Sequence, residues 1–129
     1  MSWDGYIPNL TSGLEGEPWG AICDKNNFSV LAKSDKCPIQ AGEFSAICQK
    51  SKGTDVVVTV NGKKIIVVQV DENGLKGKSS THVLVTFITG TVILICGSTF
   101  EENKVTQSAL QAAYNAIAKI GVYLKENNS

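Results

Sequence analysis

Two runs of apolar, mostly β-branched residues stand close together in the middle of the chain. They cover residues 56–60 and 65–70, and Asn61-Gly62-Lys63-Lys64 separates them. Asn-Gly between such runs predicts a tight hairpin, because both central residues of the turn need a positive φ. Both runs are apolar on both faces, so we expect both faces of these strands to be covered. The pattern predicts an antiparallel sheet with helices on its two sides.

Shorter patterns predict further strands around this hairpin. Asparagines that tolerate a left-handed turn separate one pair of apolar segments, and Thr89-Gly90 separates another. Asn73-Gly74 marks a further turn after the central hairpin. The predicted additional strands are Ala21–Asp24, Phe28–Lys33, Leu75–Lys78, His82–Ile88 and Thr91–Cys96.

Helical spacing of apolar residues appears at both ends of the chain and once between the strands. Residues 2–14 and about Lys104–Glu126 each carry an apolar stripe at helical period. Pro8 removes an amide donor within the first helix, so a kink or an early stop is expected there. A second helix is predicted over Pro38–Lys50, with Pro38 at its first position.

Composition excludes several classes of function. The length of 129 residues favours one domain. Twelve lysines, with no arginine, balance 12 acidic residues, so no global charge attracts the protein to nucleic acid. The longest apolar run, Val92–Cys96, is too short to cross a bilayer. The first residues lack the basic and apolar regions of a secretory signal, so we expect a cytoplasmic protein.

Candidate catalytic chemistry is sparse. His82 is the single histidine, and the four cysteines (Cys23, Cys37, Cys48 and Cys96) lack the C-x-x-C spacing of a zinc site. Phosphate loops, paired-histidine metal motifs and G-x-S-x-G elbows are absent from the sequence, and we expect no cofactor or metal. The thiols are interpreted as small buried apolar groups, with a thiol-dependent enzyme as the remaining catalytic alternative.

Two features suggest binding surfaces. Trp3 and Tyr6 stand near one end of the chain and Tyr123 near the other, and chain termini are often close in space. Such rings could form an aromatic groove for polyproline helices, although spacing alone favours simple packing of Trp3 on the core. The lysines that cluster around the middle strands predict either a basic corner or a solvated rim that discourages edge pairing. These lysines are Lys63, Lys64, Lys76 and Lys78.

The opening of the chain resembles that of the profilins, small proteins that bind actin monomers. Ser2-Trp3-Asp4-Gly5-Tyr6-Ile7-Pro8-Asn9-Leu10 matches every fixed position of W-x-x-Y-I-x-N-L. The resemblance extends over essentially the whole chain. Further matching segments are Gly20-Ala21-Ile22, residues 28–32 (like S-V-W-A), residues 61–69 (like G-G-x-K-x-x-V-I), the basic strand 75–78 and Val122-Tyr123-Leu124 in the closing helix.

This resemblance implies an α+β sandwich in one domain spanning residues 1–129. A central antiparallel sheet of five to seven strands would carry the terminal helices on one face and a shorter helix on the other. It implies a monomeric, cytoplasmic, cytoskeleton-associated protein that regulates actin polymerisation, with phosphoinositides as a further ligand. By resemblance, the polyproline-binding residues would be Trp3, Tyr6, Asn9, Leu31 and Tyr123. The actin-binding residues would be Lys64, Gln69, Lys76, Lys78 and His82.

Departures from the family pattern bear on both surfaces. Leu31 replaces a tryptophan and Ser129 replaces an aromatic residue. Each lost ring would cost on the order of 1 kcal/mol of proline binding. Trp19 could substitute, but local packing of Trp19 is the stronger expectation. Residues 98–107 form a longer segment than usual at the expected actin-facing edge. A small adaptor that binds proline-rich or lipid partners without actin remains the alternative.

Overall fold

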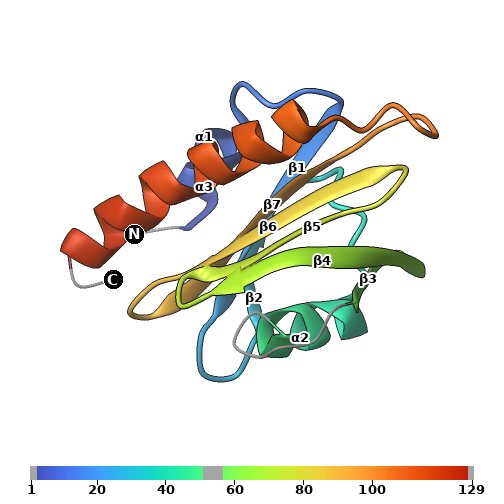
Figure 1. Ribbon diagram of the computed structural model, residues 1–129. Helices are drawn as coiled ribbons and strands as arrows, with labels where there is room; N and C mark the ends of the chain where they lie inside the picture. The colour runs from blue at the N-terminus through green and yellow to red at the C-terminus, as the bar shows by residue number, and fades with distance from the viewer. Residues whose placement is uncertain (1–2, 51–56, 128–129) are drawn as a thin grey trace.

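The computed structural model describes residues 3–50 and 57–127, in which seven antiparallel strands form one sheet with helices on both faces (Figure 1). The strands lie in the order β2-β1-β7-β6-β5-β4-β3. The helices are the 3-10 helix η1 (Trp3–Tyr6), α1 (Ile7–Thr11), α2 (Ala41–Lys50) and α3 (Gln107–Glu126). The strands are β1 (Glu17–Asp24), β2 (Val30–Lys33), β3 (Val57–Val60), β4 (Lys63–Asp71), β5 (Gly74–Lys78), β6 (His82–Ile88) and β7 (Val92–Thr99). The predicted fold class is confirmed.

The central hairpin forms where the sequence predicts it, although Val56 lies outside the described residues. Asn61 and Gly62 have φ values of 50° and 78°, as a tight hairpin turn requires. The Glu43 carboxylate in α2 accepts hydrogen bonds from the backbone N–H groups of Asn61 at 2.6 Å and Gly62 at 2.9 Å. The turn is therefore tied to the helix that packs beneath it.

The first helix is shorter than predicted and changes type. A 3-10 turn ends at Tyr6, and α1 runs only from Ile7 to Thr11. Pro8 lies in the first turn of α1, where a backbone N–H has no partner within the helix. The proline therefore marks the change from 3-10 to α-helix and does not break α1 itself.

Several other predicted boundaries are wrong by a few residues, including the start of β2, which is Val30 and not Phe28, and the end of β7, which is Thr99 and not Cys96. The second helix begins at Ala41 and not at Pro38, because Glu43 accepts the N–H of Gln40 at 2.8 Å and caps the helix there. The last helix begins at Gln107, after its N-cap Thr106. Strand β1 begins at Glu17 and not at Ala21, so it includes Pro18. Strand β2 pairs with β1 only from Ala21, so no residue of β2 meets the missing N–H of Pro18.

Two apolar cores lie on opposite faces of the sheet. On one face, α2 covers a core that includes Trp19, Ile47 and Ile65. On the other, α1 and α3 lie against each other and cover β1, β7 and β6 (Figure 1). Both terminal helices therefore share one face, as predicted. In the part of the chain that is described, no helix combines the length and apolar character needed to span a membrane.

The central hairpin, formed by β3 and β4, lies at the edge of the sheet and is not covered on both faces. The contacts of α3 reach β6, β7 and β5, whereas β4 lies farther toward the edge strand β3. Ile66 and Val68 on β4 are 61% and 51% exposed. The prediction of two covered faces is wrong for β4, because helix α3 does not extend far enough across the sheet. Ile66 and Val68 therefore form an apolar strip on β4 that is in contact with solvent.

Candidate binding surfaces

The aromatic residues near the two ends of the chain lie on neighbouring elements. The rings of Trp3 and Tyr6 have centroids 5.6 Å apart, and both side chains pack partly against the core under α1 and α3. Helix η1 contacts β2, which carries Leu31, and α1 contacts α3, which carries Tyr123. We call the set of Trp3, Tyr6, Asn9, Leu31 and Tyr123 the terminal platform.

Several platform side chains are available to a ligand. Leu31 is 41% exposed and Tyr123 is 54% exposed, and Asn9 is also exposed. The pairing between β1 and β2 shifts register so that Leu31 is the extra residue of a β-bulge, which bends the strand locally. The platform combines apolar surface with an exposed amide. Ser129, the other predicted departure, lies outside the described residues.

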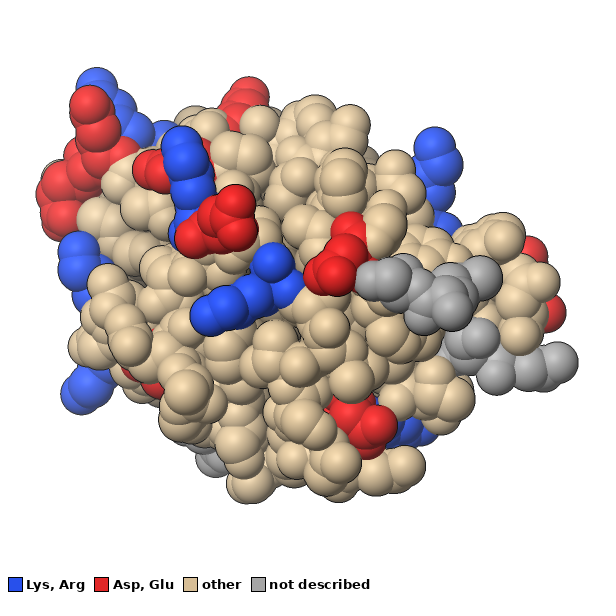
Figure 2. All heavy atoms as spheres, turned by 180° about the vertical axis from the view of Figure 1, so that it is seen from behind, with Lys and Arg blue, Asp and Glu red and all other residues tan. Residues whose placement is uncertain are grey.

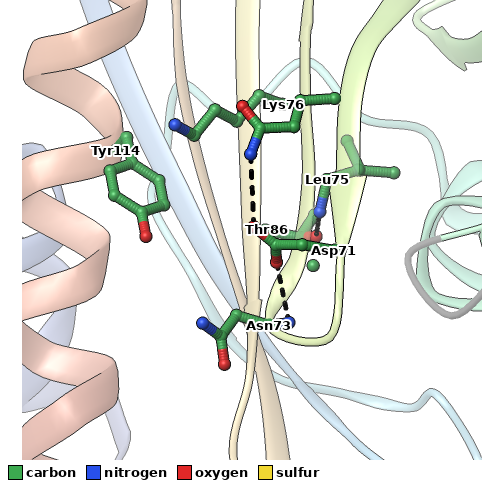
Figure 3. A pocket seen from close by; sticks show the side chains of 8 residues that line it. Asp71, Asn73, Leu75, Lys76, Thr86 and Tyr114 are labelled. Atoms are coloured by element: carbon green, nitrogen blue, oxygen red, sulfur yellow. Dashed lines mark hydrogen bonds between the residues drawn. The ribbon is translucent and has the colours of Figure 1, made fainter.

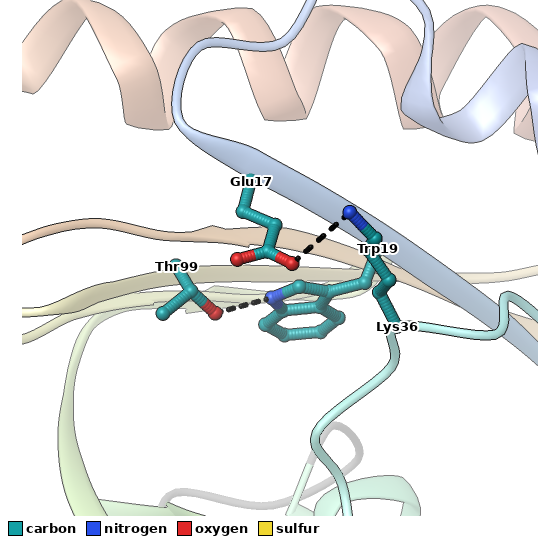
Figure 4. A network of polar contacts seen from close by, with 4 residues as sticks. All are labelled: Glu17, Trp19, Lys36 and Thr99. Atoms are coloured by element: carbon teal, nitrogen blue, oxygen red, sulfur yellow. Dashed lines mark hydrogen bonds and ion pairs between the residues drawn. The ribbon is translucent and has the colours of Figure 1, made fainter.

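Trp19 does not replace the missing platform ring. Its side chain is fully buried in the core on the α2 face, whereas Trp3 and Tyr6 pack on the opposite face. The indole Nε1–H donates to Thr99 Oγ1 at 3.0 Å, and a nearby Glu17–Lys36 ion pair spans 3.5 Å (Figure 4). The ring packs where Gly97 has no side chain, since a Cβ there would lie 2.7 Å from it. The expected local packing of Trp19 is confirmed.

A second surface lies on the bare part of the sheet, on the same face as α3. Lys64 and Gln69 of β4 are exposed, and the register sets Gln69 opposite Lys76 and Ile66 opposite Lys78. Directly paired residues point to the same face of a sheet. Val68 has no partner on β5, because it is the extra residue of a β-bulge between Val67 and Gln69, and it is exposed. We call the set of Lys64, Ile66, Val68, Gln69, Lys76 and Lys78 the sheet patch. Sequence reasoning missed Ile66 and Val68, since it assigned them to a covered strand.

The two lysines of β5 connect the sheet patch to α3. The Lys76 ammonium lies 3.7 Å from the centroid of the Tyr114 ring, and Lys78 Nζ donates to Gln107 Oε1 at 3.2 Å. In Figure 3 the Lys76 side chain extends from β5 toward Tyr114 on the helix. The patch is therefore continuous with the first half of α3.

The hollow beside Lys76 is a structural feature and not a ligand cavity. Asp71 Oδ1 accepts the backbone N–H of Asn73 at 2.8 Å, and Thr86 Oγ1 accepts that of Leu75 at 3.0 Å (Figure 3). These bonds fix the turn between β4 and β5, and the hollow is too tight to hold a small molecule. The sheet patch suits contact with a protein surface.

His82 does not belong to the sheet patch. Its side chain is 3% exposed, and its ring Nδ1 lies 2.7 Å from Thr81 Oγ1. It pairs with Thr99, whose hydroxyl faces Trp19, so His82 points to the α2 face. Burial, and then the charge of Lys63, lower the pKa of His82. The expected surface role of His82 does not fit this position, and we leave His82 out of the actin-binding set.

The long segment after β7 is held against the turn between β5 and β6. Phe100 N–H donates to Thr81 O at 2.7 Å, and Asn103 N–H donates to Ser80 O at 2.8 Å. Glu101 and Glu102 are exposed on this segment. The segment lies at the end of β5 that carries Lys78, as expected for the edge of the second surface.

The described residues offer little for catalysis. They contain no group of three histidine, cysteine, aspartate or glutamate side chains placed to hold a metal ion. A hydrogen bond to Cys48, and then burial, raise the pKa of Cys23, while burial raises the pKa of Cys37 and Cys96. Raised pKa values keep these thiols protonated, and the protonated thiol is a poor nucleophile. The alternative of a thiol-dependent enzyme gains no support from this geometry.

Charges on the face seen from behind are dispersed. Among the described residues in that view, blue and red side chains stand singly or in small groups of mixed sign (Figure 2). Such a distribution offers no broad surface of one sign to a polyanion. The lysines of the sheet patch, which follow two adjacent strands, form the more concentrated arrangement.

Comparisons with known proteins agree with this geometry. Residues 1–129 match the family model described as profilin. The chain is 31% identical over 134 residues to Profilin-P of Physarum polycephalum, covering 98% of each chain. It superposes on LokiProfilin2 from a complex with rabbit actin with a TM-score of 0.75 at 14% identity, covering 98% of each chain. It superposes on mouse profilin IIa, solved with a double repeat from the FH1 domain of mDia1, with a TM-score of 0.66 at 20% identity over the full length of both chains.

Proposed function

The chain belongs to the profilin family, and from this premise we propose that it binds monomeric actin through the sheet patch and so regulates actin polymerisation. Its action is binding and not catalysis. A structural relative, LokiProfilin2, was solved as a complex with rabbit actin. A bound monomer whose contact face is covered cannot add to a filament through that face. This function implies a cytoplasmic, cytoskeleton-associated protein.

The observation that carries the proposal is the exposed apolar strip of β4. Ile66 and Val68 remain more than half exposed although the strand is otherwise part of a packed sheet. Lys64 stands beside them on β4, and Lys78 stands opposite Ile66 on β5. An apolar centre with a charged rim is the usual anatomy of a protein–protein interface.

Actin assembly and complex formation test this proposal. The purified protein should slow the spontaneous assembly of fluorescently labelled actin and co-elute with actin monomers in gel filtration. Lys76→Glu and Lys78→Glu should weaken both effects, because each reverses a charge within the patch. Lys33→Glu is the matched control, since Lys33 is exposed on β2, at the opposite edge of the sheet. A wild-type protein that neither slows assembly nor forms the complex contradicts the proposal and leaves the adaptor alternative.

The terminal platform supports a second activity, the binding of proline-rich segments. Trp3, Tyr6 and Tyr123 provide rings, and polyproline helices dock on aromatic surfaces at a small entropic cost. Mouse profilin IIa was solved in complex with a double repeat from the FH1 domain of mDia1. Leu31 supplies apolar contact without a ring face, so binding should be weaker than with a tryptophan there.

Tryptophan fluorescence gives a direct test of the platform. Trp19 is buried on the opposite face of the sheet, so a change on adding a proline-rich peptide would report on Trp3. A saturable change that is lost in Tyr6→Ala is expected. An unchanged signal, together with no heat of binding in calorimetry, would show that the terminal platform does not bind proline-rich segments.

Acidic phosphoinositide headgroups are a further candidate ligand of the sheet patch. Lys64 is exposed on β4, and Lys76 and Lys78 lie on the neighbouring strand β5. Lysines gathered on one surface attract anionic lipid surfaces. Vesicles containing phosphoinositide should then compete with actin for the protein. Binding of vesicles that leaves the actin complex intact would place the lipid site elsewhere.

A further inference from the structure

A groove between the terminal helices adjoins the platform. Asn9 and Ser12 on the α1 side face Ala116, Lys119 and Ile120 of α3 across a space of about 190 Å³. Pockets that hold a whole small molecule usually measure about 300–1,000 Å³. The groove is therefore large enough for part of a ligand and too small for a whole one.

The groove is continuous with the platform. Asn9 belongs to both. Tyr123 follows Lys119 by four residues in α3, and residues spaced in this way lie on the same side of a helix. Tyr6 precedes Asn9 by three residues on the other side of the groove. A chain that contacts the rings of Tyr6 and Tyr123 can continue directly into the groove.

The groove presents polar groups that the protein itself leaves unused. Ile120 and Ala116 contribute apolar surface, while Asn9 and Ser12 are exposed. Within the described ranges, the side chains of Asn9, Ser12 and Lys119 make no hydrogen bond or ion pair. Lys119 is the charged residue among those that line the groove. One ammonium beside an amide and a hydroxyl matches a single carboxylate better than a multiply charged phosphate group.

We propose that this groove binds an aspartate or glutamate that flanks the proline-rich stretch of a partner, with Lys119 as its counter-ion. This inference rests on the proposed polyproline activity and specifies the partner further. Four residues of α3 span about 6 Å, and a polyproline helix rises about 3.1 Å per residue. The acidic residue should therefore stand about two positions from the proline that contacts Tyr123.

Peptides with matched charge test the inference. One peptide contains a proline run only, two others carry a glutamate at the second position before or after the run, and their controls carry glutamine there. Both placements are needed because the groove does not fix the chain direction of the ligand. One of the glutamate peptides should bind about two- to fivefold more tightly than its glutamine control at low ionic strength, the size expected for an exposed ion pair. The gain should disappear near 1 M salt, where the screening length falls to about 3 Å.

Protein variants assign the gain to the groove. Lys119→Gln should abolish the advantage of glutamate over glutamine, while Lys119→Arg should keep it. Lys125→Gln is the matched control on the same helix, since Lys125 lies outside the groove and donates to Asn73 Oδ1 at 2.8 Å. The control should keep the full advantage.

The outcomes separate this inference from the activity on which it rests. Binding of the proline-only peptide without any gain from glutamate overturns the inference and leaves the platform intact. A gain that persists in Lys119→Gln overturns it as well. If none of the peptides binds, the platform is rejected and the inference is rejected with it.

Discussion

Replacing the exposed apolar residues of β4 should weaken actin binding and leave the fold intact. Ile66→Thr and Val68→Thr both keep a β-branched side chain, so the strand propensity is little changed. Full burial of such a side chain contributes about 1.5–3 kcal/mol. Ile66 and Val68 are 61% and 51% exposed, so roughly half of that contribution is still available to a partner.

The magnitude follows from this available surface. Threonine retains one methyl group, so each substitution should remove roughly 1 kcal/mol of binding free energy, a factor of about five in Kd. If the two contributions add, the double variant should bind actin about thirtyfold more weakly. Because both side chains are exposed in the free protein, its stability should change by less than about 0.5 kcal/mol.

Two measurements on each variant check this reasoning. Fluorescence titration with labelled actin monomers gives Kd, and urea unfolding gives the midpoint of the transition. Val30→Thr is the matched control, since Val30 is an exposed β-branched residue on the opposite edge strand. Unchanged actin affinity in the double variant would refute the assignment of this strip. A loss of affinity accompanied by an equal loss of stability would refute the claim that Ile66 and Val68 do not contribute to the packing of the free protein.

Three further outcomes are expected. Tyr123→Ala should weaken binding of a proline-rich peptide by about fivefold, since one stacking ring is worth about 1 kcal/mol, and calorimetry should show actin binding unchanged. Gly121→Ala should lower the free energy of unfolding, measured in urea, by about 1–3 kcal/mol through overpacking, because a Cβ there would lie 2.2 Å from the Phe87 ring. Gly42→Ala is the control and should not destabilise the protein, because the space around Gly42 is open. Burial lowers the pKa of His82, so the unfolded state binds more protons and stability should fall as the pH drops below about 6.5. His82→Gln should flatten that decline in urea unfolding followed from pH 8 to pH 5, and an equally steep decline in the variant would assign it to other groups.

Local features of the fold were predictable because they depend on neighbouring residues. The Asn61-Gly62 turn follows from the positive φ that both residues must adopt. The stripe of α3 follows from helical spacing, and its buried residues Leu110, Ala113 and Ile117 fall on that stripe. The start of β1 was missed because a proline and two glycines precede the apolar residues, and tolerance for Pro18 depends on where a distant strand stops pairing.

The sites were harder to predict because they depend on contacts between distant segments. The sequence shows that Ile66 and Val68 are apolar, but the strand order decides that α3 does not cover them. The resemblance places His82 among the actin-binding residues, whereas its burial on the α2 face depends on its register with Thr99. The positions of Trp3, Tyr6 and Tyr123 near the two chain ends suggest the platform, whereas Asn9 and Leu31 enter only through the resemblance to profilins. The groove at Lys119 has no sequence signal, because it arises from the contact between α1 and α3.

The two surfaces should bind their partners independently. The platform lies on η1, α1, β2 and the last turns of α3, whereas the sheet patch lies on β4 and β5 (Figure 1). Titrating a proline-rich peptide into the protein alone, and into the protein saturated with actin monomers, measures their independence most directly. Two independent surfaces predict the same peptide Kd in both titrations and a ternary complex in gel filtration. Release of actin by the peptide, or of the peptide by actin, would contradict this independence.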